Sequence, residues 1–578
     1  MKRMPLIFAF ACALISGAGC TTQKKEQTPD MLQTKIDRFA PTVITADTSG
    51  LSPGNRSALR VLMNAMHLVD QLYLRQEWSG NEQLLPKLQG DQSLDGRERL
   101  EYFMMNMGPW SQLDNNEPFI PGVPRQPPGA NYYPEGMKKE EFEVWVSTLP
   151  ESEQKSAKGF FTAIRRKDDG ELGAVRYSDE YKDLLTPLAE VLRTAAGLTD
   201  NASLRSFLLK RAEAFQSNDY YESDVAWMKL DSPIDVTIGP YEVYLDELFN
   251  YKAAFEAFIT LRNDEETAKL QRLTSYLQEI ENHLPIAPRY RNPKLGALAP
   301  IRVVDEVAIG GEARGGVQTA AYNLPNDERI VREMGSKRVM LRNVQEAKFN
   351  KVLLPISRIA LDSTQRTMVQ FEPFFTHILA HELMHGLGPH NITAHGHATT
   401  VRQEMKELGS ALEEAKADIS GLFAFQYLID KGVFPNQQEA AQQGSDKSTP
   451  APTLEQQLYA TYLAGIFRTL RFGFGDAHGK GMALQCNYLW DEGAIVYNES
   501  SGTFQVIFPK IRVAVSKLTG EIMTIQAEGS YDKARALLDR YVTIRPLMQR
   551  ALDALKAIPV DIRPSFPLAG EPDVTGTK

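Results

Sequence analysis

Histidines are concentrated in one short stretch of this chain. Most of the nine histidines fall between residues 377 and 397, and the centre of this stretch reads His381-Glu382-Leu383-Met384-His385. On a helix, residues i and i+4 share a face, so both imidazoles can reach one ion while Glu382 lies beside them. The pattern predicts a metal site with His381 and His385 as ligands and Glu382 as a general base for hydrolysis.

A second group of acidic residues can complete the site. The segment Glu413-Glu414-Ala415-Lys416-Ala417-Asp418 follows within residues 401–427, which are helical by composition. A hydrolytic zinc site needs three protein ligands and one open position for water. Glu414 and Asp418 are at i and i+4, so one can bind the ion while the other accepts a hydrogen bond from a ligand histidine. Two imidazoles and a carboxylate favour one zinc ion per chain over calcium or magnesium. The alternative is an acidic helix face that only meets solvent.

The remaining histidines of the stretch are weaker candidates. His377 precedes His381 by one helical turn, and we expect it to pack in the core or to support a ligand. His390, His395 and His397 fall in the predicted loop after the metal helix. An accessory metal site in that loop is the less favoured interpretation.

Several segments must position these residues. The apolar run 374–387 predicts a buried helix that carries both ligand histidines. Residues 251–283 are helical by composition, and residues 300–360 contain β-branched stretches, broken by Gly and Asn, that predict strands. The proline-rich segment 108–137 predicts a long ordered loop on the surface.

The composition excludes several classes of protein. The chain has 578 residues, of which 43% are hydrophobic and 24% are charged, so it is neither disordered nor a coiled coil. Its net charge is −9 and the sequence contains no basic block, which argues against a nucleic-acid partner.

The N-terminus predicts export. Lys2 and Arg3 precede an apolar run, residues 6–15, that is too short to span a bilayer. Small residues then lead to Cys20, as in a bacterial lipobox. We expect residues 1–19 to be a lipoprotein signal peptide, and the protein to be anchored through a lipid on Cys20 at the outer membrane, facing the periplasm. A plain secretory signal is the alternative. Processing leaves Cys486 as the single free thiol, so no internal disulfide is expected.

Taken with other segments, the metal motifs resemble those of the dipeptidyl peptidase III family of zinc exopeptidases. The family motif is usually a hexapeptide, and this chain has the pentapeptide of some bacterial members. Further segments that resemble family landmarks follow in family order: Gly239-Pro-Tyr-Glu-Val-Tyr244, Tyr322-Asn-Leu-Pro-Asn326 and Asp476-Ala-His478. The resemblance covers about residues 239–490. It departs at position 482, where the family has an arginine and this chain has Met482.

The resemblance implies a role for each residue at the metal. It makes His381, His385 and Glu414 the zinc ligands, with Glu413 and Asp418 as hydrogen-bond acceptors for the ligand histidines. Glu382 then takes the proton of a zinc-bound water and delivers it to the leaving amine.

The resemblance also implies which residues contact the peptide. Tyr244 and His478 donate hydrogen bonds to the oxyanion of the transition state. Glu242, Asn323 and Asn326 bind the substrate. Each has a structural alternative: Tyr244 as a strand core residue, the two asparagines as turn residues, and His478 as a surface loop residue.

The family fold implied is α+β with two lobes around a wide cleft. One lobe is mainly helical and binds zinc, and the other contains a small β-barrel. We expect a signal peptide at residues 1–19 and a polar tether at 20–50. A mixed lobe with the substrate-binding segments then spans 51–335, and the helical catalytic lobe spans 336–578.

The function predicted is that of a zinc metallopeptidase, a monomer, that hydrolyses short peptides and releases N-terminal dipeptides. One alternative is a zinc hydrolase of the same fold with another cleavage register or a non-peptide amide substrate. Another is a peptide-binding lipoprotein without catalysis. Glu382 argues against this last possibility, because a binding protein needs no general base.

Overall fold

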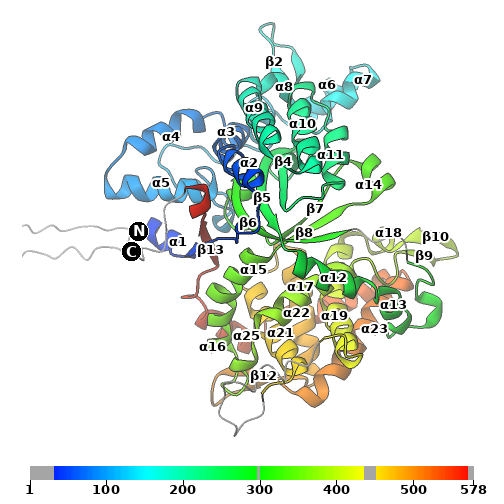
Figure 1. The fold of residues 1–578 in the computed structure, drawn as a ribbon. Helices are drawn as coiled ribbons and strands as arrows, with labels where there is room; N and C mark the ends of the chain where they lie inside the picture. The colour runs from blue at the N-terminus through cyan, green and yellow to red at the C-terminus, as the bar shows by residue number, and fades with distance from the viewer. Residues whose placement is uncertain (1–30, 296–299, 435–450, 571–578) are drawn as a thin grey trace, which may run out of the picture.

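The computed structural model describes residues 31–295, 300–434 and 451–570. The predicted signal peptide, Cys20 and the first part of the predicted tether lie outside these residues, so export and lipidation stay predictions. No helix among the described residues has both the length and the apolar character needed to cross a membrane. Figure 1 shows two lobes, a mixed lobe above and a mainly helical lobe below.

A five-stranded sheet lies at the centre of the mixed lobe. Its strands run in the order β4-β5-β6-β8-β7. They are β4 (Ile234–Glu242), β5 (Ala254–Arg262), β6 (Ile301–Gly311), β8 (Lys337–Leu341) and β7 (Ala321–Leu324). Strand β8 is parallel to β6 and antiparallel to β7, and the other pairs are antiparallel.

The expected β-barrel is not closed in the described part of the chain. Strands β4 and β7 are the two edges of the sheet and share no ladder. Side chains connect these edges instead: the hydroxyls of Thr237 and Tyr322 are 2.9 Å apart, and Asn326 Nδ2 donates to the Tyr241 carbonyl at 2.9 Å. Strand β7 has only four residues, so it offers few backbone groups for closing a barrel.

Helices cover this sheet, extend the mixed lobe and pack at its junction with the helical lobe. They are α2 (Pro53–Met63), α3 (Met66–Glu77), α4 (Asn81–Gly90), α5 (Leu94–Asn106), α6 (Lys139–Ser147), α7 (Glu151–Ala157), α8 (Tyr177–Glu180), α9 (Lys182–Leu198), α10 (Ala202–Ser217), α11 (Tyr221–Met228), α12 (Asp264–Thr274), α13 (Leu277–His283) and α14 (Glu328–Met334). The two that pack at the junction are α12 and α13. Strands β2 (Thr162–Arg166) and β3 (Leu172–Arg176) form a separate hairpin. Segment 108–137 contains only two short 3-10 turns and is otherwise irregular, in keeping with the predicted loop.

The lower lobe consists mostly of helices. They are α15 (Arg342–Lys348), α16 (Leu354–Ala360), α17 (Phe371–Met384), α18 (Val401–Met405), α19 (Gly409–Asp430), α21 (Leu454–Leu470), α22 (Ala477–Asp491), α23 (Phe508–Ala527), α24 (Tyr531–Tyr541) and α25 (Pro546–Ala554). Two hairpins complete it, β9 (Asn391–Ala394) with β10 (His397–Thr400) and β11 (Ile495–Asn498) with β12 (Thr503–Val506). Helix α17 packs against α19, and α19 packs against α22 and α23.

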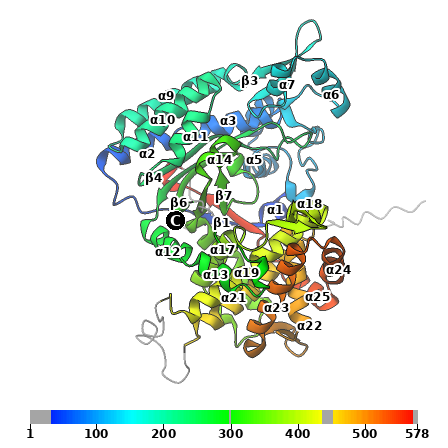
Figure 2. The same ribbon diagram turned by 90° about the vertical axis from the view of Figure 1, so that its right-hand side faces the viewer.

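The ends of the described chain meet in the mixed lobe. Strand β1 (Phe39–Val43) pairs in parallel with β13 (Asp561–Ser565), and the two lie side by side in Figure 2. Helix α1 (Met31–Ile36) precedes β1. The predicted tether is therefore wrong for residues 31–50, because Phe39 and Ile44 are buried in the cores of the fold.

The seam between the lobes is apolar. Val303 of β6 and Met340 of β8 share a buried cluster with Leu379 and Met384 of α17 and with Met523 of α23. Burial of such side chains contributes about 1.5–3 kcal/mol each relative to exposure. The metal helix is thus fixed to the sheet of the mixed lobe.

Candidate active site

Helix α17 carries both histidines of the motif. Most of its apolar side chains are buried, and His381 itself is only 8% exposed. His385 follows Met384 as the C-terminal cap residue and keeps helical backbone angles. The two imidazoles therefore share a face, as the i and i+4 spacing predicts.

Helix α19 brings the acidic residues to the same place. It packs closely on α17 at Gly421, where an added Cβ would lie 3.1 Å from the His381 backbone nitrogen and 3.4 Å from His377 Nε2. Only glycine allows this separation without a shift of either helix. The close packing sets Glu413, Glu414 and Asp418 beside the histidines.

Three ligand atoms converge between these helices. His381 Nε2 and His385 Nε2 are 3.1 Å apart, and Glu414 Oε2 lies 3.3 Å from the first and 3.6 Å from the second. Glu414 Oε2 is buried. The three residues satisfy the spacing of a shared metal site.

Each ligand histidine is held by a carboxylate on its other nitrogen. His381 Nδ1 lies 2.8 Å from Asp418 Oδ1, and His385 Nδ1 lies 3.0 Å from Glu413 Oε1. When each Nδ1 donates its proton to the carboxylate, the Nε2 lone pairs of both imidazoles point toward Glu414 Oε2, so three electron-pair donors converge on one position. A cation resolves that conflict, which is why the residues fit a bound metal ion.

A further layer supports these carboxylates. Lys416 Nζ lies 2.7 Å from Glu413 Oε1, and Gln485 Nε2 donates to Asp418 Oδ2 at 3.3 Å. Burial alone would raise the pKa of Glu413, but the hydrogen bonds from His385 and Lys416 outweigh it and lower the pKa to about 2. Glu413 is therefore ionised and places a negative charge beside His385.

His478 lies at the start of α22, next to the metal ligands. Its Nδ1 is 3.1 Å from Glu414 Oε2. Asp476 caps the helix by accepting from the Gly479 amide at 2.9 Å. His478 therefore belongs to the site and is not an isolated surface residue.

Glu382 contacts an arginine that the sequence analysis missed. Arg338 of β8 donates through Nη1 to the Glu382 carbonyl, and its Nε lies 3.7 Å from Glu382 Oε2. In the β7–β8 ladder, Arg338 is paired with Asn323. No local motif could have indicated Arg338, because its position depends on the register of the sheet.

A cavity of about 330 Å³ opens beside the metal ligands. His381, Glu382 and His478 line it, together with Met482 of α22 and Arg468 of α21. His377 also lines it, and its Nε2 lies 3.0 Å from the carbonyl oxygen of Asp418, which connects α17 to α19. Arg468 is the second residue that sequence reasoning missed.

The predicted substrate-binding residues lie elsewhere in the mixed lobe. Tyr244 is 71% exposed and borders another cavity of about 100 Å³, which it shares with Glu77 and Glu312. Glu242 ends β4, and burial raises its pKa. None of the four predicted residues lines the cavity at His381, so the structure leaves them apart from the metal ligands. The other two, Asn323 and Asn326, are exposed on and just after β7.

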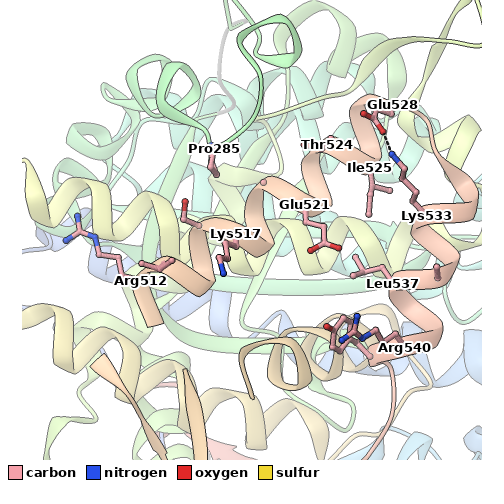
Figure 3. Close-up of a pocket in the computed structure, with 15 residues that line it drawn as sticks. Pro285, Arg512, Lys517, Glu521, Thr524, Ile525, Glu528, Lys533, Leu537 and Arg540 are labelled. Atoms are coloured by element: carbon pink, nitrogen blue, oxygen red, sulfur yellow. Dashed lines mark hydrogen bonds and ion pairs between the residues drawn. The ribbon is translucent and has the colours of Figure 1, made fainter. Parts of the chain in front are cut away.

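A larger cavity, of about 920 Å³, lies between α23 and α24 and contains none of the metal ligands (Figure 3). Most of its charged side chains are already in ion pairs. Lys533 Nζ lies 2.7 Å from Glu528 Oε2, as the dashed line in Figure 3 shows, and Lys517 Nζ lies 2.7 Å from Glu492 Oε2. The lysine and arginine side chains of this cavity are therefore already in ion pairs.

Comparison with known proteins agrees with the geometry. The sequence profile described as "Peptidase family M49" matches residues 134–390. An Arabidopsis thaliana protein named Nudix hydrolase 3 is 41% identical, over 93% of this chain and 74% of that protein. Dipeptidyl peptidase 3 of Rattus norvegicus is 26% identical, over 28% of this chain and 22% of that protein.

Solved structures extend the match to nearly the whole chain. Dipeptidyl peptidase III of Caldithrix abyssi is 44% identical, with a TM-score of 0.88 over 93% of this chain and 99% of that one. The enzyme of Corallococcus sp. strain EGB is 50% identical, with a TM-score of 0.76 over 93% and 97%. With the converging histidines and glutamate already in place, this likeness makes the chain a peptidase that belongs to the dipeptidyl peptidase III family, peptidase family M49.

Proposed function

We propose that this peptidase is a zinc enzyme that releases dipeptides from the N-termini of short peptides. The observation that carries the proposal is the convergence of His381 Nε2, His385 Nε2 and Glu414 Oε2 within 3.1–3.6 Å of one another. Two imidazoles and a carboxylate are the ligand set of hydrolytic zinc sites. Zinc, when bound, lowers the pKa of water and polarises the scissile carbonyl.

The residues around that position divide the proton and charge chemistry between them. Glu382 takes a proton from the attacking water and returns it to the leaving amine. Arg338 holds the Glu382 backbone and stays near its carboxylate. His478, beside Glu414, donates a hydrogen bond to the developing oxyanion. Tyr244 serves the same oxyanion only after the two lobes approach each other, because it borders a different cavity here.

The cleavage register rests on Glu242. Among the described residues, none forms a hydrogen bond or ion pair with its side chain. A half-buried carboxylate without a cation suits the ammonium group of a peptide, and the side-chain carbonyls of Asn323 and Asn326 supply neutral acceptors. If these groups hold the amino end two residues before the scissile bond, the enzyme counts dipeptides from the N-terminus.

Product analysis tests this register. Peptides of four to eight residues, each with a free or an acetylated N-terminus, are incubated with zinc-loaded enzyme and followed by mass spectrometry. We expect dipeptide release from the free amines and little turnover of the acetylated peptides. Glu242→Gln should lose that preference, because it removes the charge that balances the ammonium. Equal cleavage of both peptide sets, or release of single residues, would reject the register and leave the metal site intact.

A further inference from the structure

An arginine without a partner lies in the cavity at the metal. Arg468 is near the end of α21 and lines the cavity together with Thr461, Thr469 and Phe472. Its guanidinium lies 5.9 Å from the centre of the Phe374 ring. Within the described part of the chain, Arg468 has no hydrogen bond and no ion pair. Burial of this group lowers its pKa, partly offset by the charge of Asp561.

The charges around Arg468 are already engaged. Asp561 Oδ2 lies 2.9 Å from Lys348 Nζ and accepts from the Gln318 amide at 2.7 Å. Arg471, on the next turn, donates to the carbonyls of Ile558 and Pro559. This end of the cavity therefore has an excess of positive charge. A guanidinium removed from water without a partner is unfavourable, and an anionic ligand removes that cost.

We propose that the Arg468 end of this cavity is a carboxylate-binding subsite for the leaving part of the peptide. The proposal rests on the proposed function, because the same cavity contains His381, Glu382 and His478. The guanidinium can hold one carboxylate through two parallel hydrogen bonds. The subsite lies in the metal cavity, whereas Glu242 and the two asparagines lie outside it, so the peptide is held at both ends.

One feature of the sequence supports this assignment. At position 482, where the family resemblance expects an arginine, the cavity is lined by Met482, which has no charge. Arg468 supplies a cation to the same cavity from a different helix. A single guanidinium matches a single carboxylate, and the cavity also contains Glu382 and Asp476, which disfavour an anion of higher charge.

Equilibrium binding tests the subsite without depending on turnover. Zinc-loaded Glu382→Gln protein is titrated by calorimetry with one peptide in three forms. These are the free C-terminal acid, the C-terminal amide, and an amide with a glutamate near its C-terminus. We expect the acid to bind at least about 10-fold more tightly than the amide, because the amide leaves Arg468 unpaired. Recovery of tight binding by the glutamate peptide would show that a side-chain carboxylate can occupy the subsite.

Variants assign the effect to Arg468. Arg468→Gln should remove the preference for the acid, and Arg468→Lys should keep part of it. Lys480→Gln, which removes an exposed cation of α22, should leave the preference unchanged. Equal binding of all three peptides to the parent protein would overturn the proposal, and that result does not depend on any variant folding. A full preference for the acid in folded Arg468→Gln would overturn it as well. If the wild-type enzyme cleaves none of the peptides, the proposed function is contradicted. The binding preference of Arg468 would still be measured independently.

Discussion

At the scale of single residues, the hydrogen-bond partner of each nitrogen and oxygen atom defines the site. Both ligand histidines use Nδ1 for a carboxylate and leave Nε2 toward Glu414. The same logic applies to Glu242 and Arg468, since neither has an ion-pair partner among the described residues. The carboxylates bonded to His381 and His385 indicate the candidate metal position. The charges of Glu242 and Arg468, unpaired within the described part of the chain, indicate where the two ends of the peptide are proposed to bind.

Asp418→Asn should weaken zinc binding by about 10- to 100-fold, because an amide holds the imidazole of His381 less firmly and adds no charge. Competition with a chromogenic chelator measures the affinity. Asp430→Asn, the same change near the far end of α19 in an exposed pair with Arg512, is the control. Equal zinc affinity of both variants would show that Asp418 does not support the ligand.

Glu312→Gln should stabilise the protein at pH 8 and much less at pH 5. Burial and then the charge of Glu242 raise the pKa of Glu312 from 4.5 to about 8. The folded chain therefore keeps a proton between pH 4.5 and 8 that the unfolded chain loses, so stability falls as pH rises through this window. Glutamine has the shape of the protonated carboxyl group and does not ionise, so the variant avoids the loss of stability between pH 4.5 and 8. Thermal unfolding at both pH values is the measurement, and the same shift at each would contradict a raised pKa.

At the scale of elements, three helices must approach closely for the site to exist. Gly421 sets the distance between α17 and α19, and Gly481 sets that between α22 and α19. An added Cβ at Gly481 would lie 3.0 Å from the Ala415 backbone nitrogen and 3.4 Å from the Ala411 carbonyl oxygen. Both neighbours are backbone atoms of α19, so they cannot rotate away.

Gly481→Ala should therefore lower kcat by moving His478 relative to Glu414, and should destabilise the fold by about 1–3 kcal/mol through overpacking. Gly197→Ala is the matched control, since nothing lies within 4 Å of a Cβ there. That change should stabilise α9 by about 0.5–1 kcal/mol. A Gly481→Ala enzyme with unchanged kcat and stability would show that α22 can shift without affecting the site.

The spacing of residues close in sequence was enough to predict the helix that carries the motif histidines and the acidic residues that lie beside them. The run 374–387 predicts a helix, and α17 begins at Phe371 and carries both histidines. The helical interpretation of residues 251–283 is wrong for β5, whose aromatic and β-branched residues are buried in the sheet. Arg338 and Arg468 could not be predicted, because sheet register and helix packing bring them to the site. The expected β-barrel is not closed among the described residues, and pairing of edge strands is a long-range property that local patterns do not predict.

At the scale of the whole molecule, each lobe contains a different part of the candidate site. The helical lobe contains the metal ligands and Arg468, and the mixed lobe contains Tyr244, Glu242 and the two asparagines (Figure 1). The apolar seam at Met340 and Leu379 fixes the lobes at one side. In the proposed function, closure about that seam is the motion by which the residues proposed to bind the peptide would reach the candidate metal site.

Asp561→Asn should reduce the stability of the whole chain by about 3–5 kcal/mol, because it leaves buried Lys348 without a counter-charge. Both side chains of this pair are 2–3% exposed, and the pair ties β13 to α15. Thermal unfolding measures the effect. Asp553→Asn breaks an exposed pair with Lys556 and should leave the melting temperature unchanged. Equal melting temperatures for all three proteins would show that the buried pair adds no stability.

The most direct measurement compares bound zinc and dipeptide release in Glu382→Gln. The variant should keep one zinc per chain and lose turnover by about 10²- to 10⁴-fold, because it removes the proton acceptor and no ligand. Glu414→Ala, measured in parallel, should lose both the zinc and the activity. A Glu382→Gln enzyme that releases dipeptides at the wild-type rate would contradict the account, as would a wild-type enzyme that stays active without zinc.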